Sequence, residues 1–366
     1  MTTLAAPMVE EPEGLGEQDG SSWVDYPLDT VLIRHETHTV FEVVRRIGQQ
    51  KFVMDPDFQR EFVWPEEKQS KLIESVLMRI PLPVFYLAED KQGRRVVVDG
   101  LQRLTTFDLF LNNKFRLKLK DQQKLDGKLF RELAPHLQTR VEDCNLVLYV
   151  IDSKVPEGVR LDIFDRVNSG EPLTRQQMRN SLYSGSATHF LKAEASTGLF
   201  AEATGKSLQS KTMRDREFVN RFCAFQLLSI DEYKGDMDDF LAKALRQMNA
   251  MSPAGLETLS QEFRTGLTNN LAMFGKHAFR KHLPNSTDRA VLNASLWDVM
   301  MTGLSRVDSK KCVRMQAELK AAFYRLMTDE RFDKSITRGP NAATEVKHRF
   351  TASRAQLAEV FGANAT

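Results

Sequence analysis

Asp99, Gly100 and Arg103 are the residues of this 366-residue chain whose types and spacing best suit chemistry. The β-forming run 96–98 leads into Asp99-Gly100, and helical spacing begins directly afterwards. The unpaired N–H groups of a helix start favour phosphate or carboxylate, and a glycine lets a ligand approach the backbone. Arg103 lies about one turn into the helix, where its forked donors suit a phosphate or Asp99. The structural alternative makes Asp99 an N-cap and Arg103 its surface partner.

The segment 57–65, DFQREFVWP, carries donors among aromatic side chains. Gln59 and Arg60 stand beside aromatic residues that include Trp64. An arginine next to aromatic rings is suited to stacking a base or holding a phosphate. The alternative is that the aromatic residues belong to the core and that Arg60 is a surface charge.

A third segment, 164–180, has the sequence FDRVNSGEPLTRQQMRN. Asn168-Ser169-Gly170 predicts a tight turn, and Thr174 is a suitable N-cap for the helix that follows. Asn168 and Arg179 could reach a ligand from this position. The alternative is a purely structural turn.

The pattern that must position these residues predicts an α+β fold. Apolar spacing and turn residues predict helices over 39–47, 68–78 and 100–111, and strands over 84–88, 95–98 and 144–152. After residue 155 the spacing is almost entirely helical. We therefore expect a disordered acidic tail over 1–22, a mixed α/β domain over 23–155, an α-helical domain over 156–355 and a flexible C-terminus over 356–366.

Composition excludes several classes of protein. Fifty-one Lys plus Arg against 49 Asp plus Glu, a net charge of +2, argues against a polybasic protein held to DNA by bulk charge. Three widely spaced cysteines, Cys144, Cys223 and Cys312, provide no disulfide framework and no CxxC metal site. Seven acids and no Lys or Arg in the first thirty residues do not fit a secretory signal. We expect a cytoplasmic protein without membrane contact.

The ordered set of motifs resembles one family. FQR-x-FVWP is followed by a helix and a Pro-x-Pro strand, then by VVDGLQRLTT, and then by the 164–180 segment. This order is similar to that of the N-terminal domain of GmrSD-type restriction endonucleases, which is built on a ParB/sulfiredoxin-like core. The resemblance covers roughly residues 25 to 190, and the pattern of 331–350, with its Arg349, resembles stand-alone members.

The resemblance implies a nucleotide-dependent module of bacterial defence against foreign DNA. The family's Asp-Gly-Gln-Gln-Arg signature, which is associated with NTP binding and hydrolysis, corresponds to residues 99–103. It implies that Asp99, Gln102 and Arg103 are catalytic, with Gln102 orienting a water and Asp99 binding Mg²⁺ or acting on that water. The nucleotide-binding residues it implies are Gln59, Arg60, Trp64, Gly100, Arg103 and Asn168. The nucleotide is expected near the junction with the helical domain.

Two positions depart from the family pattern, and a third feature bears on cleavage. Leu101 replaces the first glutamine of the signature, and Gln177 replaces a carboxylate after the Asn-Gly turn. Either change could weaken hydrolysis and leave binding intact. His277 and His282 are close in sequence but lack the His-Asn-His pattern of the nuclease domain that usually follows, so we do not expect them to be metal ligands.

Three functions follow as expectations. The first is an NTP-binding and NTP-hydrolysing protein of DNA restriction or anti-phage defence, with a separate nuclease or defence subunit as partner. The second is a non-catalytic DNA-binding or adaptor module with the same fold. The third is a ParB-like nuclease that uses Asp99 with a metal, although no cluster of acids or histidines provides a two-metal site.

Overall fold

The computed structural model describes residues 11–15, 33–54, 64–90, 92–155, 157–167 and 174–362. Two compact units make up the chain. We call Val24–Leu182 the sheet unit, and Met1–Trp23 together with Tyr183–Thr366 the helical unit. The expected α+β class is confirmed, because a mixed sheet comes first in the chain and a long helical region follows it.

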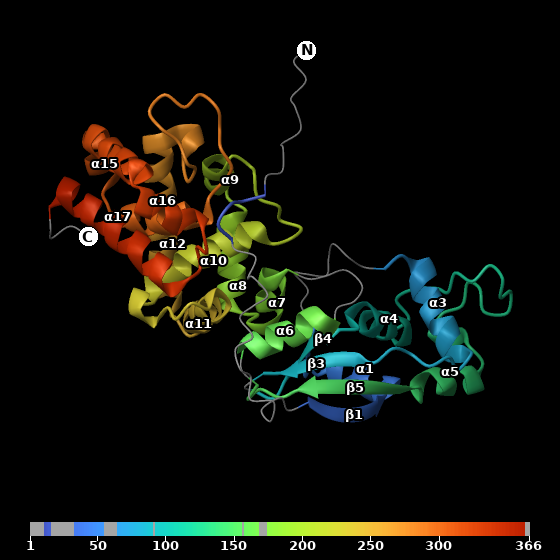
Figure 1. Ribbon diagram of the computed structural model, residues 1–366. Helices are drawn as coiled ribbons and strands as arrows, with labels where there is room; N and C mark the ends of the chain where they lie inside the picture. Colours follow the sequence, from blue (N-terminus) through green and yellow to red (C-terminus); the bar gives the residue numbers. More distant parts are fainter. Residues whose placement is uncertain are drawn as a thin grey trace, which may run out of the picture. The chain divides into compact units, whose positions relative to one another are not determined.

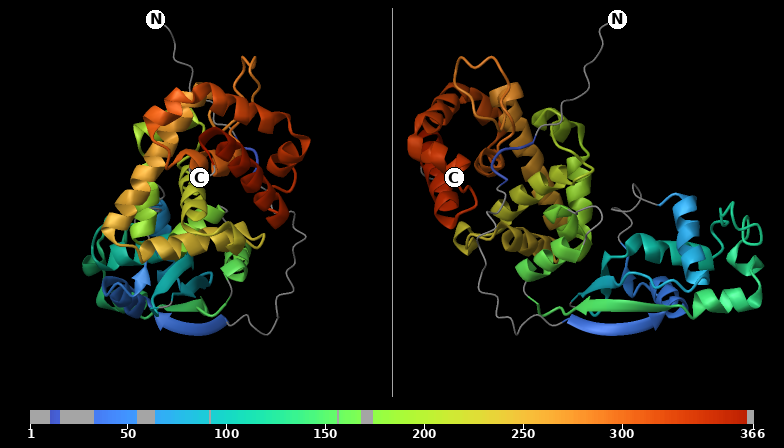
Figure 2. Two further views of the ribbon diagram at one scale, coloured as in Figure 1. Left: turned by 90° about the vertical axis from the view of Figure 1, so that its left-hand side faces the viewer. Right: turned by 45° about the vertical axis from the view of Figure 1, so that its right-hand side comes forward.

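The described part of the sheet unit contains a five-stranded mixed sheet in the order β1-β5-β3-β4-β2. Figure 1 labels four of these strands, β1, β5, β3 and β4, which follow one another in this order. Its strands are β1 (Ile33–Thr39), β2 (Phe52–Val53), β3 (Phe85–Glu89), β4 (Arg95–Asp99) and β5 (Asn145–Ile151). The β1–β5 and β3–β4 pairs are antiparallel, whereas β3–β5 and β2–β4 are parallel. Figure 2 shows β1 and β5 side by side at one edge.

Helices bury the apolar side chains of this sheet. They are α1 (Val40–Gly48), α3 (Glu66–Leu77), α4 (Leu101–Leu111), α5 (Pro135–Glu142), α6 (Glu157–Val167) and α7 (Arg175–Leu182). Alternate strand residues such as Phe85, Leu87 and Leu148 meet Leu104 and Phe107 of α4 in one core, as expected where one face of each element is apolar. The helices α6 and α7 contact β4.

Most elements of the sheet unit lie where the sequence predicts them. The sequence pattern did not predict β1 or β2, nor α5, which lies between α4 and β5. It also assigned residues after 155 to the helical domain, whereas α6 and α7 belong to the sheet unit in the structure. The ParB/sulfiredoxin-like part of the fold prediction rests on the sequence resemblance.

The described part of the helical unit consists almost entirely of helices. They are α8 (Ser186–Ala195), α9 (Gly198–Thr204), α10 (Arg214–Leu227), α11 (Met237–Asn249), α12 (Pro253–Phe274), α13 (Ala294–Leu304), α14 (Ser309–Arg314), α15 (Gln316–Thr328), α16 (Glu330–Thr337) and α17 (Ala343–Phe361). None of the helices in the described ranges combines the length and the apolar character needed to cross a membrane.

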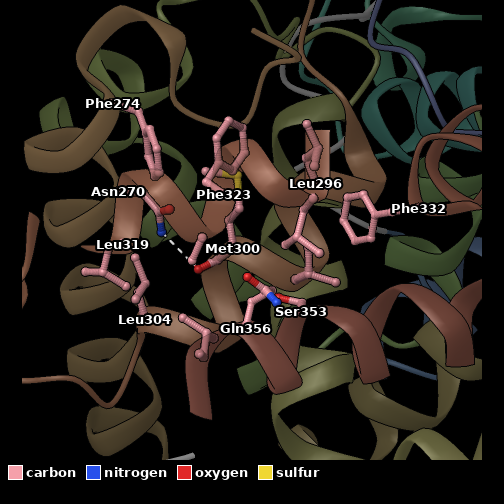
Figure 3. A pocket seen from close by; sticks show the side chains of 15 residues that line it. Asn270, Phe274, Leu296, Met300, Leu304, Leu319, Phe323, Phe332, Ser353 and Gln356 are labelled. Atoms are coloured by element: carbon pink, nitrogen blue, oxygen red, sulfur yellow. Dashed lines mark hydrogen bonds between the residues drawn. The ribbon is translucent and has the colours of Figure 1, made fainter. Parts of the chain in front are cut away.

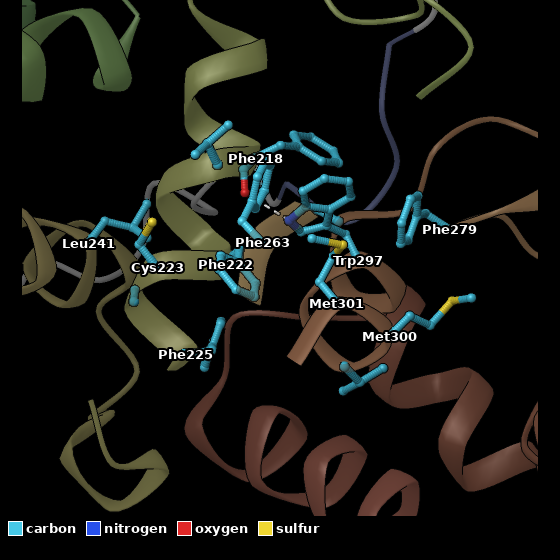
Figure 4. Close-up of a cluster of buried hydrophobic side chains, with 14 of the residues drawn as sticks. Phe218, Phe222, Cys223, Phe225, Leu241, Phe263, Phe279, Trp297, Met300 and Met301 are labelled. Carbon is cyan, nitrogen blue, oxygen red and sulfur yellow. Dashed lines mark hydrogen bonds between the residues drawn. The ribbon is translucent and has the colours of Figure 1, made fainter. Parts of the chain in front are cut away.

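Trp297 of α13 lies at the centre of the helical core (Figure 4). Its ring meets the Phe218 ring edge to face, with the centroids 5.2 Å apart. Its Nε1 donates a hydrogen bond of 2.7 Å to the backbone carbonyl of Phe218. Phe263 and Phe279 contact other parts of the indole. Buried aromatic pairs of this kind add to the hydrophobic stabilisation of the core.

Part of the expected disordered acidic tail is ordered, which corrects the prediction for residues 11–15. Glu13 forms a parallel β-bridge with Asn293 of the helical unit. Its backbone N–H donates to the carbonyl of Leu292 at 2.7 Å, and its carbonyl accepts from Ala294 at 2.8 Å. The high proportion of acids predicted a solvated tail, but partners far along the chain bind this stretch. The rest of the predicted tail lies outside the described residues.

Candidate functional site

Gly100 forms the corner between β4 and α4 and occupies the N-cap position of the helix. Its φ of +97° is a left-handed conformation, which glycine adopts without strain. A Cβ at this position would lie 2.3 Å from Cδ1 of the buried Phe85. The helix start therefore requires glycine, and no side chain caps it. The interpretation of Asp99 as the N-cap is wrong, and the amides of the first turn remain suited to an anion.

Arg103 is held by several partners at once. Its Nη2 donates to Asp99 Oδ2 at 2.7 Å and to the carbonyl of Val84 at 3.1 Å, and its Nη1 donates to the carbonyl of Pro83. The guanidinium also lies 4.3 Å from the centre of the Phe85 ring. Burial lowers the pKa of Arg103, and Asp99 opposes this shift. Arg103 thus links the helix start to the chain before β3 and orients the Asp99 carboxylate, a pairing that the sequence predicts.

Gln102 and Trp64 are brought together. The backbone N–H of Trp64 donates to Gln102 Oε1 at 3.0 Å, and Gln69 Nε2 donates to the Trp64 carbonyl at 2.6 Å. Gln102 therefore anchors the chain at the point where the FQR-x-FVWP segment ends. Gln59 and Arg60 of that segment, like Asn168, lie outside the described residues.

The positions that depart from the family pattern have structural partners. Leu101 is half-buried and packs against the core of the sheet unit. Gln177 Oε1 accepts the backbone N–H of Thr174 at 2.7 Å, and the Thr174 hydroxyl accepts the N–H of Gln177 at 3.2 Å. This reciprocal pair is a capping box, a role that glutamate and glutamine both fulfil. Arg179, on the same helix, donates to Gln176 Oε1 at 2.9 Å.

A magnesium ion at this helix start would have one carboxylate beside it, that of Asp99. No three His, Cys, Asp or Glu side chains in the described ranges form a group that could hold a metal. Mg²⁺, however, commonly uses one or two carboxylates plus substrate phosphates. Arg103 engages Asp99 Oδ2, and the Asp99 side chain is 33% exposed. Asp99 would hold the ion, whose charge would offset that of the phosphates.

Two cavities lie away from this helix start. An apolar pocket of about 50 Å³ in the helical unit is lined by residues such as Leu296, Phe323 and Asn270, whose Nδ2 donates to the Met300 carbonyl at 3.0 Å (Figure 3). It is too small for a nucleotide.

A cleft of about 630 Å³ lies in the sheet unit between the end of α3 and α5. Polar side chains that line it include Arg79, His136, Arg140 and Cys144. Burial raises the pKa of the Cys144 thiol, which does not favour a nucleophile. No local pattern in the sequence indicates this cleft, because its walls come from two segments about sixty residues apart.

His277 and His282 stack with ring centroids 4.9 Å apart. Burial lowers the pKa of both rings, and the nearby Lys276 and Arg280 lower that of His277 further. The folded protein therefore resists a proton that the unfolded chain accepts at an ordinary histidine pKa near 6.5. This contribution to stability is present above that value and is lost as the pH falls below it.

We expect the Tm to fall between about pH 7.5 and pH 5.5, and to fall less in His282→Gln. The measurement is thermal unfolding by circular dichroism at both pH values, so that the difference, rather than the Tm of each variant, is compared. His136→Gln, at an exposed position, is the control. If the Tm of His282→Gln falls between the two pH values by as much as that of the wild-type protein, His282 does not contribute to the pH dependence.

The comparisons with known proteins agree with the motif order. Residues 40–184 match the family model described as GmrSD restriction endonuclease, N-terminal domain. No curated protein and no solved structure matches the chain. The resemblance drawn from the sequence is confirmed over the matched residues, which include α4 and the corner that precedes it.

Proposed function

We propose, from the match of residues 40–184 to the N-terminal domain of GmrSD restriction endonucleases, that this chain binds a nucleoside triphosphate at the start of α4. The observation that carries the proposal is the corner at Gly100. There an uncapped helix N-terminus, a glycine that a larger residue replaces only with strain and the oriented carboxylate of Asp99 occur together. The nucleotide serves the restriction of foreign DNA, and a separate nuclease or defence subunit is the partner.

Each residue of the corner has a distinct role in this proposal. The first-turn amides of α4 bind phosphate oxygens, and Asp99 holds Mg²⁺ or orients the attacking water. Arg103 is a positioning residue, because its donors are directed to Asp99 and to the carbonyls of Pro83 and Val84. Gln102 positions Trp64 and the segment before it rather than a water.

Asp99→Asn is the sharpest test, because an asparagine can still accept a hydrogen bond from Arg103 but lacks the charge. We expect affinity for a nucleoside triphosphate with Mg²⁺ to fall by about tenfold or more, which is about 1.4 kcal/mol, and phosphate release to fall with it. The measurement is binding and phosphate release with ATP, GTP, CTP and UTP, with and without DNA.

Asp90→Asn is the matched control. Asp90 pairs with Arg94 at the same i,i+4 spacing and the same 2.7 Å, in the turn between β3 and β4. It should leave nucleotide binding unchanged. If no triphosphate binds the wild-type protein, the proposal fails. If binding is lost in Arg140→Ala and kept in Asp99→Asn, the nucleotide occupies the cleft of the sheet unit instead.

The alternative, a non-catalytic DNA-binding or adaptor module, is favoured by one feature. Leu101 packs against the core of the sheet unit, and the side chains of Gln102 and Arg103 are hydrogen-bonded within that unit. Few polar groups of the signature are therefore left to catalyse NTP hydrolysis. DNA binding that Asp99→Asn leaves unchanged, in a protein that releases no phosphate, would support this function. The ParB-like nuclease gains no support, since the described residues contain no cluster of metal-binding side chains.

A further inference from the structure

Residues 11–15 bind the helical unit through an isolated parallel β-bridge between Glu13 and Asn293, and the chain turns directly after it at Gly14. Glu13 donates its N–H to the carbonyl of Leu292 and accepts the N–H of Ala294, at 2.7 and 2.8 Å. Ala294 is the first residue of α13, so its N–H has no acceptor within the helix. Backbone hydrogen bonds of this kind provide affinity in peptide recognition by strand addition, and side chains provide specificity.

Side chains of the helical unit contact two residues of this segment, Glu13 and Leu15. Asn293 Nδ2 donates to the Glu13 carboxylate at 3.2 Å, and Lys281 Nζ lies 3.6 Å from the same group. Asn341 Nδ2 donates to the carbonyl of Leu15 at 3.1 Å. The side chain of Leu15 is half-buried and packs against the core of the helical unit. Charge, backbone and an apolar side chain are all engaged.

Gly14, between these residues, is required by the conformation of the segment. Its φ is +80°, and a Cβ would lie 3.3 Å from Ser295 Oγ and 3.5 Å from the carbonyl of Ile336. A residue with a side chain would adopt this positive φ only with backbone strain, and its Cβ would come close to Ser295 and Ile336. The recognised sequence is therefore Glu-Gly-Leu rather than any acidic segment.

Bonds within the helical unit hold the recognition surface in place without the segment. Asn293 donates its backbone N–H to the carbonyl of Phe279 at 2.9 Å. Its Oδ1 accepts the N–H of Leu296 at 2.9 Å, and its Nδ2 also donates to the carbonyl of Ile336 at 3.1 Å. Asn293 and Asn341 lie 280 and 326 positions along the chain from the residues that they bind, and Asn293 is held by partners within the helical unit itself.

We propose that this surface of the helical unit, formed by Lys281, Leu292, Asn293, Ala294 and Asn341, is a recognition site for a short acidic peptide that turns at a glycine. The form that it accepts is Glu-Gly-Leu. Residues 13–15 occupy the site in cis, and the same sequence binds in trans when they are removed. The inference is independent of nucleotide binding, because all of its residues belong to the helical unit.

The test removes residues 1–16 and adds them back as a peptide. A fluorescent peptide of residues 9–18 should bind the truncated protein and bind the full-length protein at least about tenfold more weakly, because the covalently linked segment competes at high effective concentration. The measurement is fluorescence polarisation. A Gly14→Val peptide should bind at least about tenfold more weakly than the wild-type peptide. The substitution Asn341→Ala in the protein should weaken binding of the wild-type peptide. A scrambled peptide is the control.

A second variant covers the case in which the truncated protein does not fold. A protease recognition sequence inserted between Gln18 and Asp19 lets the full-length chain fold before it is cut. After cleavage the N-terminal fragment should co-elute with the protein on gel filtration, and excess wild-type peptide, but not the Gly14→Val peptide, should displace it. Equal binding of the scrambled and wild-type peptides, or loss of the fragment on cleavage without rebinding, would overturn the proposal.

Discussion

Asp298→Ala is expected to lower the free energy of unfolding of the helical unit by about 3–5 kcal/mol. Asp298 of α13 is fully buried and is the shared partner of two buried arginines. Arg221 of α10 donates to Oδ1 at 2.9 Å and to Oδ2 at 2.6 Å, and Arg349 of α17 donates to Oδ2 at 2.9 Å. Without the carboxylate, two guanidinium groups remain buried without the ion-pair partner that they share.

The size of this effect follows from desolvation rather than from the strength of the ion pairs. Burial lowers the pKa of Arg349, and Asp298 opposes that shift. Arg349 also donates to the carbonyl of Pro340, so it connects α17 to the chain that precedes it. Breaking one member of a buried group leaves uncompensated charge, whereas replacing the whole group by apolar residues is often neutral or stabilising.

Denaturant unfolding of three proteins separates these explanations. Asp298→Ala should show the full loss. The triple variant Asp298→Leu, Arg221→Met, Arg349→Met should recover most of the stability, because no buried charge remains. Asp333→Ala removes an exposed pair with Lys281 and should cost less than about 1 kcal/mol. A loss below about 1 kcal/mol in Asp298→Ala, or a triple variant less stable than Asp298→Ala, would contradict the argument.

Local patterns were sufficient for the elements around the candidate site. The helix of α4 and the strands β3, β4 and β5 have apolar spacing that is visible in a short window, and the sequence predicts each of them. The strand β1, IRHETHT, lacks that spacing, because most of its residues are exposed or half-buried. It is a strand because it pairs with β5 over its whole length, a partner more than one hundred residues away.

Tertiary partners explain why the remaining site predictions were incomplete. The sequence predicts the Asp99–Arg103 pair because the two residues are four positions apart, a spacing of about one helical turn. It does not predict that Arg103 also binds the carbonyls of Pro83 and Val84, because this depends on how β3 lies against α4. The contact of Gln102 with Trp64 is of the same kind. Polar residues in a signature can therefore have a structural role instead of a catalytic one, and their contacts in the fold distinguish these two roles.

The ordering of residues 11–15 has the same cause. Acidic and small residues without local apolar spacing predict a solvated tail. The partners of Glu13 and Leu15 are residues such as Asn293 and Asn341, which no short window of sequence brings near them. A glycine with left-handed geometry, Gly14, is the sequence signal that fits the contact, although it becomes informative only when its neighbours are known.

Gly100→Ala is expected to destabilise the sheet unit by about 2–5 kcal/mol and to abolish nucleotide binding. Two physical effects add together. The φ of +97° strains any residue with a Cβ, and that Cβ would lie 2.3 Å from a carbon of the Phe85 ring. Phe85 is fully buried beneath Arg103, so the ring cannot move aside without disturbing the core.

Two companion variants separate the backbone strain at Gly100 from the collision of its Cβ with Phe85, and they show how each affects nucleotide binding. Gly93→Ala has a similar φ of +76°, but the nearest atom to its Cβ would be 3.9 Å away, so it should cost about 1 kcal/mol and leave binding unchanged. Adding Phe85→Leu to Gly100→Ala should recover part of the lost stability, because the collision is relieved and the strain remains. Unfolding in denaturant and nucleotide binding are measured on all variants. If Gly100→Ala costs no more stability than Gly93→Ala and still binds nucleotide, the close packing at the start of α4 is not what the proposed phosphate site requires.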